Sequence, residues 1–381
     1  MLRTSELEYD LPEDRIALEP ATPRDAARLM VVDRPTGRWR DDARVSQLPG
    51  LLRAGDLIVF NTTRVIPARL LGRREDTGGQ VEGLFLARAT GRPGEHWTVL
   101  LRAKKVRPGM RFVLDRPDGT GPGSVHLQAV ERVDGEPGAW VVAVEDQAPG
   151  EALGHAGHTP LPPYILKARE HAHLQVAETT DRDRYQTVYA REPGSVAAPT
   201  AGLHFTPELL AALASMGVQR ADVTLHVGTG TFRPVEADVV ESHPMHTEYC
   251  EMAPETVRIV LAARREGRRV IAVGTTTART LESYAAAWEA LLQQGLSETE
   301  ALARLPQGLD TKLLITPGYQ WRWVSGLMTN FHLPRSTLLA MVGAFLAPGS
   351  AAGLRDLKAL YARAIDTGYR FYSYGDAMLI L

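Results

Sequence analysis

Four histidines, His204, His226, His243 and His246, lie close together in the chain among turns rich in glycine and threonine. Imidazole side chains exchange protons near neutral pH, so these residues are first candidates for acid–base chemistry. His204 follows a Pro-Thr-Ala-Gly turn, and His226 precedes the Gly-Thr-Gly-Thr turn at residues 228–231, whose amides and hydroxyls can hold a carboxylate, ribose or phosphate. A tight turn or a core histidine explains each piece alone, and only their concentration favours chemistry.

A second concentration of polar residues follows a predicted buried strand. Residues 269–274 pass directly into Thr275, Thr276 and Thr277, which open a predicted helix that carries Arg279. A strand, a glycine and a hydroxyl-rich helix start make an anion site, because free helix amides and hydroxyls face the ligand. The turn lacks the lysine of a P-loop and the glycines of a dinucleotide fingerprint.

Further candidates are polar residues set among apolar ones. Asn61 and Arg64 follow the apolar run at residues 57–60, where α/β proteins often place ligand-binding groups. A turn cap and a solvated charge are the structural alternatives for these two. The C-terminal section adds Asn330, His332, Arg335 and Asp376.

The spacing His-x-x-His occurs twice, at residues 155–158 and 243–246, which raises the question of zinc. Neither pair carries the glutamate of a zinc-protease helix, Pro244 interrupts one pair and Gly157 weakens the other. The single cysteine, Cys250, excludes an internal disulfide and a site of several thiolates. We therefore predict no metal ion and a reducing, cytoplasmic location.

The pattern of elements predicts an α/β main domain with an inserted all-β domain. Helix and strand patterns alternate in residues 1–70 and 151–381, whereas residues 71–150 show no convincing helix. Short β-rich runs at hairpin spacing there predict a small closed or nearly closed β-barrel. These runs are residues 80–87, 96–103, 110–114, 124–133 and 140–144.

The expected barrel carries a basic run without an acidic residue. Its members are Arg102, Lys104, Lys105, Arg107 and Arg111. A solvated hairpin tip explains such a run on charge alone, and the functional alternative is a loop that contacts nucleic-acid phosphates. The 381-residue chain has a formal net charge of −2, which excludes indiscriminate coating of nucleic acid but allows a local basic groove. We find no signal-peptide pattern, and the most apolar run, residues 337–347, is too short to span a membrane.

Seven motifs together resemble one family, the S-adenosylmethionine:tRNA ribosyltransferase-isomerases of queuosine biosynthesis. They are YDLPEDRIALEP, FNTTRVIPARL, GSVAAPTAGLHFT, TLHVGTGTFRPV, GTTTARTLES, TNFHLPRSTLL and YRFYSYGDAML, and they run from Tyr9 to Met378. The resemblance implies an irregular barrel-like α/β main domain with an inserted β-barrel. It also implies transfer of the ribosyl part of S-adenosylmethionine to preQ1, the aminomethyl-deazaguanine at the tRNA wobble position. The products are epoxyqueuosine, adenine and methionine.

The implied chemistry begins with removal of a C5′ proton that the neighbouring sulfonium makes acidic. It needs a base, polarisation of the departing adenine and a water-poor pocket. We assign proton transfer to His204 and His226. The sequence departs from the family pattern at Thr62 and Ser325, where relatives often carry aspartate, so the identity of the base stays open.

Substrate binding is assigned by residue type. We expect ribose and the methionine carboxylate at Thr229, Gly230, Thr231 and residues 275–277, with Arg279 or Arg233 as the carboxylate partner. We expect Tyr319, Phe331 or Tyr374 to face the sulfonium. Asn61, Arg64, Asn330, His332, Arg335 and Asp376 are expected to complete the pocket or to face the tRNA.

The implied partners are S-adenosylmethionine, as a co-substrate, and tRNA carrying preQ1. No cofactor, metal or membrane is expected, and a monomer is favoured. Two rival functions remain: a methyltransferase of unusual fold, which would yield S-adenosylhomocysteine, and a non-catalytic RNA-binding protein that uses the basic run.

Overall fold

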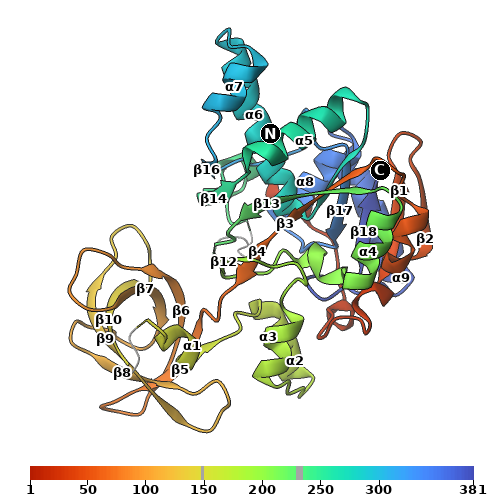
Figure 1. The fold of residues 1–381 in the computed structure, drawn as a ribbon. Coiled ribbons are helices and arrows are strands. Elements are labelled where there is room, and N and C mark those ends of the chain that lie inside the picture. Colours follow the sequence, from red (N-terminus) through yellow and green to blue (C-terminus); the bar gives the residue numbers. More distant parts are fainter. Residues whose placement is uncertain (147–149, 229–234) are drawn as a thin grey trace. The chain divides into compact units, whose positions relative to one another are not determined.

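The structure, a computed structural model, describes residues 1–146, 150–228 and 235–381, which form two compact units (Figure 1). The main unit comprises Met1–Arg64, Pro163–Ala172 and Gln186–Leu381, and the barrel unit comprises Val65–Pro162 and His173–Tyr185. The barrel unit thus begins before residue 71 and extends beyond residue 150. The extension includes β11 (Gly157–His158), which pairs with a barrel strand, and α3 (Glu178–Arg184), whose Glu178 accepts hydrogen bonds from Thr159.

The main unit is built on a nine-stranded mixed sheet. In spatial order its strands are β16 (Gly308–Thr311), β14 (Glu248–Glu251), β13 (Gln219–Leu225), β3 (Leu57–Asn61), β15 (Val270–Val273), β17 (Gly326–Asn330), β18 (Ala377–Ile380), β1 (Arg28–Asp33) and β2 (Arg38–Arg44). Strands β13, β3, β15 and β17 are parallel, and β18 is antiparallel to β17. The carboxyl ends of the four parallel strands and the start of β18 therefore share one edge of the sheet.

Both faces of this sheet are buried, because its central strands are apolar at nearly every position. In β3, Leu57 and Val59 belong to one core, and Ile58 and Phe60 belong to the other, as the alternation of side chains along a strand requires. The first core packs against α5 (Pro254–Arg265), α6 (Thr275–Gln293), α7 (Glu298–Arg304), α8 (Thr337–Leu346) and α9 (Gly353–Asp366). The second packs against α4 (Pro207–Ser215) and the 3₁₀ segments Val45–Gly50 and Thr200–His204.

Local sequence signals fix the helices that border the functional edge. Thr206 caps the start of α4, since its Oγ1 accepts a hydrogen bond from the Leu209 amide at 3.1 Å. Helix α6 begins directly after β15 and Gly274, whose φ of 92° favours glycine. Two smaller elements, β4 (Thr63–Val65) and β12 (Glu192–Ser195), pair with each other, and α2 (Pro163–His171) also belongs to the main unit.

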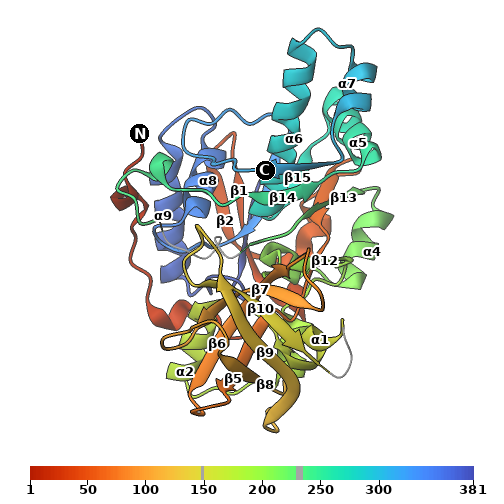
Figure 2. The ribbon, with the colours of Figure 1, turned by 90° about the vertical axis from the view of Figure 1, so that its left-hand side faces the viewer.

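The barrel unit contains a closed β-barrel (Figure 2). Its strands follow the spatial order β5 (Arg69–Arg74), β6 (Gln80–Arg88), β7 (His96–Arg102), β10 (Ala139–Glu145), β9 (Pro122–Arg132) and β8 (Arg111–Asp115), and β8 pairs back with β5. Helix α1 (Ala152–Ala156) follows the barrel. Trp97 and Phe112 are completely buried inside it. The predicted fold class, an α/β protein with an inserted β-barrel, is confirmed.

Closure of the barrel depends on a close approach at Gly72, which pairs with Leu114 of β8. A Cβ atom at this position would lie 2.3 Å from the Val113 carbonyl oxygen, so a side chain here would push β5 and β8 apart.

None of the helices in the described parts of the chain is long and apolar enough to cross a membrane.

Candidate functional site

A cavity lies at the edge of the main sheet where β15 and β17 end. Gly274, Thr275 and Thr276 line it from the junction of β15 and α6. Residues 329–332 line it from the end of β17, and residues 197–201 line it from the segment before α4. Carboxyl ends of parallel strands are the usual ligand-binding edge of an α/β sheet.

The three threonines that open α6 have different positions. Thr275 and Thr276 line the cavity, whereas Thr277 is fully buried and its hydroxyl donates to the Val273 carbonyl oxygen at 2.7 Å. Thr277 is thus occupied within the helix. The structure brings two of the three predicted hydroxyls to the cavity.

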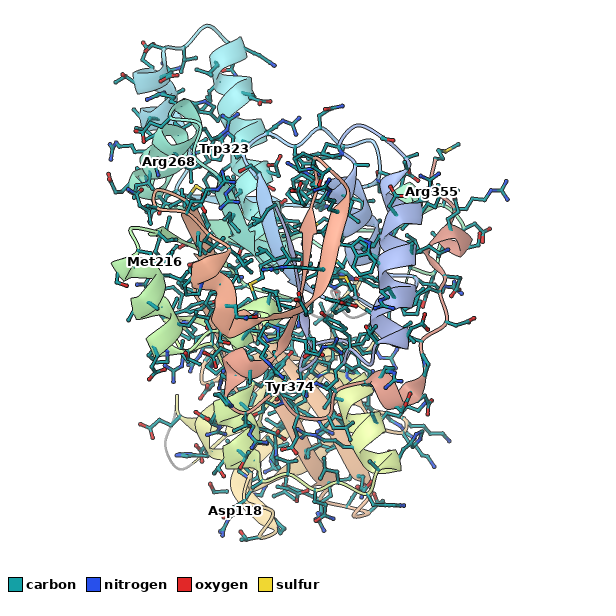
Figure 3. The ribbon with its side chains drawn as sticks, turned by 90° about the vertical axis from the view of Figure 1, so that its right-hand side faces the viewer. Asp118, Met216, Arg268, Trp323, Arg355 and Tyr374 are labelled. Carbon is teal, nitrogen blue, oxygen red and sulfur yellow. The ribbon has the colours of Figure 1, made fainter. Side chains whose placement is uncertain are left out.

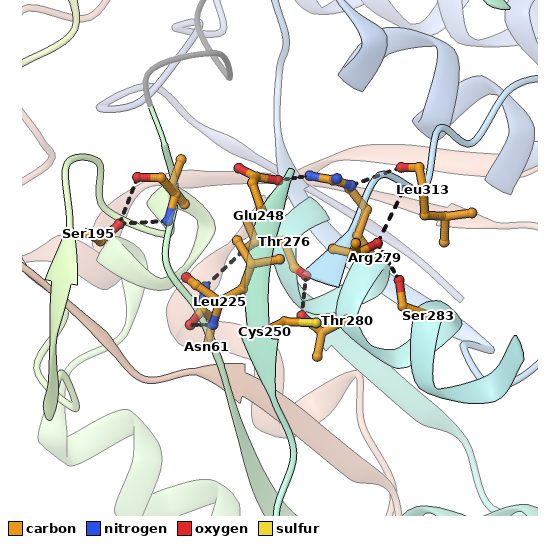
Figure 4. A network of polar contacts seen from close by, with 12 residues as sticks. Asn61, Ser195, Leu225, Glu248, Cys250, Thr276, Arg279, Thr280, Ser283 and Leu313 are labelled. Atoms are coloured by element: carbon orange, nitrogen blue, oxygen red, sulfur yellow. Dashed lines mark hydrogen bonds and ion pairs between the residues drawn. The ribbon is translucent and has the colours of Figure 1, made fainter. Parts of the chain in front are cut away.

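Asn61 connects three elements beneath the cavity (Figure 4). Its Nδ2 donates to the Leu225 carbonyl oxygen at 3.0 Å and to Thr276 Oγ1 at 3.2 Å, and its Oδ1 accepts from the Leu225 amide. The side chain is completely buried and does not line the cavity. Asn61 therefore joins β3 to β13 and to the start of α6, and thereby positions Thr276.

His204 is connected to the cavity through Asn330, which lines it. Asn330 Nδ2 donates to the Tyr372 carbonyl oxygen at 3.1 Å and to His204 Nε2 at 3.2 Å, while its Oδ1 accepts from the Thr200 hydroxyl at 3.1 Å. Both amide hydrogens are used, so Asn330 offers the cavity an acceptor only. His204 Nε2 must accept and hence lacks a proton; burial, with Arg370 and Arg24 nearby, lowers the pKa of His204 to about 3.

His332 is the imidazole that lines the cavity itself, among the described residues. Its Nε2 lies 2.7 Å from Thr329 Oγ1, and its backbone amide donates to the Tyr361 hydroxyl at 2.9 Å. Desolvation lowers the pKa of His332 to about 4, so the ring is neutral near pH 7 and able to accept a hydrogen bond, while the same shift makes it a weaker base than a free imidazole.

His226 follows the end of β13 and does not line the cavity; its neighbour Val227 does. His226 Nδ1 lies 2.7 Å from Thr63 Oγ1, and its ring packs so closely on Gly194 that a Cβ there would lie 2.9 Å from it. Burial lowers the pKa of His226, partly offset by Glu251 and Glu192. His204 and His226, the two histidines assigned to proton transfer, thus lie next to the cavity, but neither of them lines it.

Arg279 lines a second pocket together with His243 and His246. It forms a buried ion pair with Glu248, and its Nε donates to the Leu313 carbonyl oxygen at 3.0 Å (Figure 4). The second pocket and the cavity share Leu338, so the two sites adjoin.

The aromatic residues expected near a sulfonium are separated. Phe331 lines the cavity and packs edge-on or tilted against Tyr361, Tyr369 and Phe371. Tyr319 instead donates to Glu282 at 3.0 Å, away from the cavity lining. Tyr374 is buried ahead of β18, at the opposite end of the sheet from Trp323 (Figure 3).

Three charged residues predicted to bind substrate also lie outside the cavity lining. Asp376 is buried and accepts from the amides of Arg28 and Arg370 at 3.0 and 2.8 Å, which secures the turn before β18. Arg335 lies 3.5 Å from Glu8, and Arg64 is exposed. Four further predicted residues, Thr229, Gly230, Thr231 and Arg233, lie outside the described residues.

The basic run forms the β7–β8 connection of the barrel unit. Arg102, Lys104, Lys105 and Arg107 are exposed, and Val106 is buried between them. Arg111 differs, because it forms ion pairs with Glu75 and Glu145 that raise its pKa. Four of the five predicted phosphate contacts are thus exposed side chains of one loop.

Sequence reasoning missed several residues that line the cavity. Tyr164 of α2 lies within hydrogen-bonding distance of Ser373, and both line it, as do Thr200 and Ser336. Tyr164 follows the prolines at the start of α2 and lies in none of the seven motifs, whereas Ser373 lies in a C-terminal motif that did not indicate the direction of its side chain. No group of three His, Cys, Asp or Glu side chains able to hold a metal ion occurs in residues 1–146, 150–228 and 235–381.

The fold is that of an α/β protein with an inserted β-barrel. Its cavity carries polar groups at the carboxyl edge of the parallel strands, where α/β enzymes usually bind their substrates. A family model described as queuosine biosynthesis protein matches residues 4–380. The chain therefore belongs to the queuosine biosynthesis protein family.

Individual relatives match over the whole length. The chain is 46% identical over 384 residues to the S-adenosylmethionine:tRNA ribosyltransferase-isomerase of Chelativorans sp. (strain BNC1), with 100% of this chain and 99% of that protein covered. It is 46% identical over 386 residues to the protein of the same name from Gloeobacter violaceus, with 99% and 96% covered. A crystal structure of S-adenosylmethionine tRNA ribosyltransferase from Thermotoga maritima is 32% identical and covers 99% of this chain and 100% of its own, with a TM-score of 0.49.

Proposed function

We propose that this protein transfers and isomerises the ribosyl part of S-adenosylmethionine onto preQ1 at the wobble position of tRNA. The products are epoxyqueuosine in tRNA, adenine and methionine. The observation that carries the proposal is 46% identity over the full length to enzymes named for this activity. S-adenosylmethionine is a co-substrate here, and the proposal includes no cofactor. A monomeric state and a cytoplasmic location are further parts of it.

The cavity supports this chemistry through its hydrogen-bond acceptors. Asn330 presents an acceptor only, which suits a ribose hydroxyl or the amino group of adenine. His332 lines the cavity as a neutral imidazole and is our proposed proton acceptor there. His204 holds Asn330 in orientation, so we propose a positioning role for it; the assignment of His226 to proton transfer stays a prediction.

The test is to incubate the purified protein with S-adenosylmethionine and tRNA that carries preQ1. Adenine release and the mass of the modified nucleoside are followed together. We expect adenine in step with the mass of epoxyqueuosine. S-adenosylhomocysteine with a gain of one methyl group would instead identify a methyltransferase, and tRNA binding without either product would leave an RNA-binding protein.

A further inference from the structure

One terminal nitrogen of the Arg279 guanidinium has no hydrogen-bond partner among residues 1–146, 150–228 and 235–381. Nε donates to Leu313 and Nη1 pairs with Glu248, but Nη2 is buried and unpaired. The side chain is only 6% exposed. Buried donors of charged groups are nearly always paired, because an unpaired one loses its hydration without compensation. The unpaired Nη2 therefore points to a ligand.

The pocket around Arg279 indicates which ligand it is. Leu314, Ile315, Met245 and Met341 give it an apolar wall, beside the one arginine among the lining residues that the structure describes. An apolar wall with a single guanidinium nitrogen suits a carboxylate on an aliphatic or thioether chain. Glu248 does not compete for this position, since it binds Nη1.

The position along α6 relates this pocket to the cavity. Thr276 lines the cavity and Arg279 lines the pocket, and three residues of helix correspond to a rise of about 4.5 Å. The cavity and the pocket also share Leu338. One extended ligand can therefore place its polar sugar at the start of α6 and its carboxylate one turn further along.

We propose that Arg279 Nη2 binds the carboxylate of the methionine part of S-adenosylmethionine, while Glu248 holds the guanidinium in place. This inference rests on the proposed function and deepens it, because it assigns one end of the co-substrate to a pocket next to the cavity. The same position receives the carboxylate of the methionine that is released.

Calorimetric titration of the unaltered protein tests the site from the ligand side. Decarboxylated S-adenosylmethionine, which lacks only the carboxylate, should bind about 10- to 100-fold more weakly than S-adenosylmethionine, the range expected for one hydrogen bond to a charged group. L-methionine should compete with S-adenosylmethionine better than L-methioninamide does. Equal affinity of the two sulfonium ligands would overturn the inference, and so would competition by inorganic phosphate without competition by methionine.

Two variants test the site from the protein side. Arg279→Lys keeps a cation beside Glu248 but removes the second terminal nitrogen, so the preference for the carboxylate ligand should disappear. Glu248→Gln is the matched control, because it keeps Arg279 Nη2 and should retain the preference. Loss of the preference in Glu248→Gln as well would show that the buried pair is only structural, against the inference.

The measurements separate this inference from the proposed function. Normal release of adenine from S-adenosylmethionine, combined with equal binding of the decarboxylated ligand, rejects the carboxylate site and leaves the reaction intact. Absence of adenine release and of S-adenosylmethionine binding rejects both. Should Arg279→Lys not fold, the comparison of ligands on the unaltered protein decides the question.

Discussion

The two imidazoles that contact Asn330 or the cavity are neutral near pH 7, because His204 is buried and His332 is half-buried with little access to water. The pKa of His204 falls from 6.5 to about 3, and that of His332 falls from 6.5 to about 4. Charging His204 would create a buried cation, and among the described residues no carboxylate pairs with either ring. His204 would in addition lose the acceptor nitrogen that holds Asn330.

This burial predicts how stability depends on pH. Below pH 6.5 the unfolded chain protonates His204 while the folded chain does not, so the unfolded state binds more protons and stability falls as pH falls, down to about 3. Between about pH 6 and pH 5 the loss from His204 is roughly 1 kcal/mol. His332 acts in the same direction down to about pH 4. Urea unfolding of the protein at the two pH values measures the sum.

A glutamine substitution isolates the contribution of His204 to the pH dependence of stability. His204→Gln should reduce the difference in unfolding free energy between the two pH values, whatever its effect on the stability itself. His171→Gln is the comparison variant, because this side chain is 56% exposed in the same unit, 3.8 Å from Glu13, and His204→Gln should reduce the difference more than His171→Gln does. An undiminished difference in His204→Gln would contradict the assignment of a buried neutral ring.

Kinetics distinguish a proton acceptor from a positioning residue. His332→Gln preserves a hydrogen-bonding group beside Thr329 but cannot take a proton, so we expect kcat to fall about 10²- to 10⁴-fold with little change in S-adenosylmethionine affinity. For His204→Asn we expect weaker S-adenosylmethionine binding, since Asn330 loses its orientation. A larger loss of kcat in His226→Gln than in His332→Gln would return the base to the position predicted from sequence.

Residue-level prediction from sequence succeeded where the local pattern was continuous. The run from β15 through Gly274 to Thr275 and Thr276 leads directly to the cavity, as the strand–glycine–helix pattern indicated. The role of His204 depends on Asn330, 126 residues further along the chain, and no local pattern reports such a contact. Asp376 is polar among apolar residues for a structural reason, because it secures the turn before β18.

At the scale of elements, sequence identified the barrel but missed the strand that closes it. The five predicted runs correspond to β6, β7, β8, β9 and β10, whereas β5 (Arg69–Arg74) was not recognised. The sequence of β5, RLLGRR, is basic and interrupted by Gly72, so it does not resemble a strand. That glycine is nevertheless what allows β8 to approach. A feature that weakens the local signal is thus required by the closed barrel.

Gly72→Ala should therefore loosen the seam between β5 and β8. The added methyl group would lie 2.3 Å from the Val113 carbonyl oxygen, and overpacking of this kind costs about 1–3 kcal/mol. We expect amide hydrogen exchange in β5 and β8 to accelerate about 5- to 100-fold. Gly154→Ala is the matched control in the same unit, because nothing lies within 4 Å of its added methyl group. Unchanged exchange in Gly72→Ala would show that the seam tolerates the methyl group.

At the scale of the whole molecule, the two units differ in the chemistry that they expose. The main unit holds the cavity with its buried acceptors, and the barrel unit exposes a loop of basic side chains. Recognition of a polyanion requires exposed cations that can release counterions, whereas the chemistry requires groups removed from water. This division predicts that tRNA binding and S-adenosylmethionine binding respond to different substitutions.

Neutralising Lys104, Lys105 and Arg107 to glutamine tests this division. Each exposed cation that contacts a phosphate contributes about 0.7 to 0.9 to the slope of log affinity against log salt, so the triple variant should bind tRNA more weakly and with a slope shallower by about 2 to 3. Arg111→Gln serves as the control: its guanidinium is already paired with Glu75 and Glu145, so the slope should change little.

Adenine release at saturating tRNA should stay normal in the triple variant, because the cavity is untouched. An unchanged salt slope would remove the loop from the tRNA interface, and loss of adenine release at saturation would show that the loop also serves the reaction.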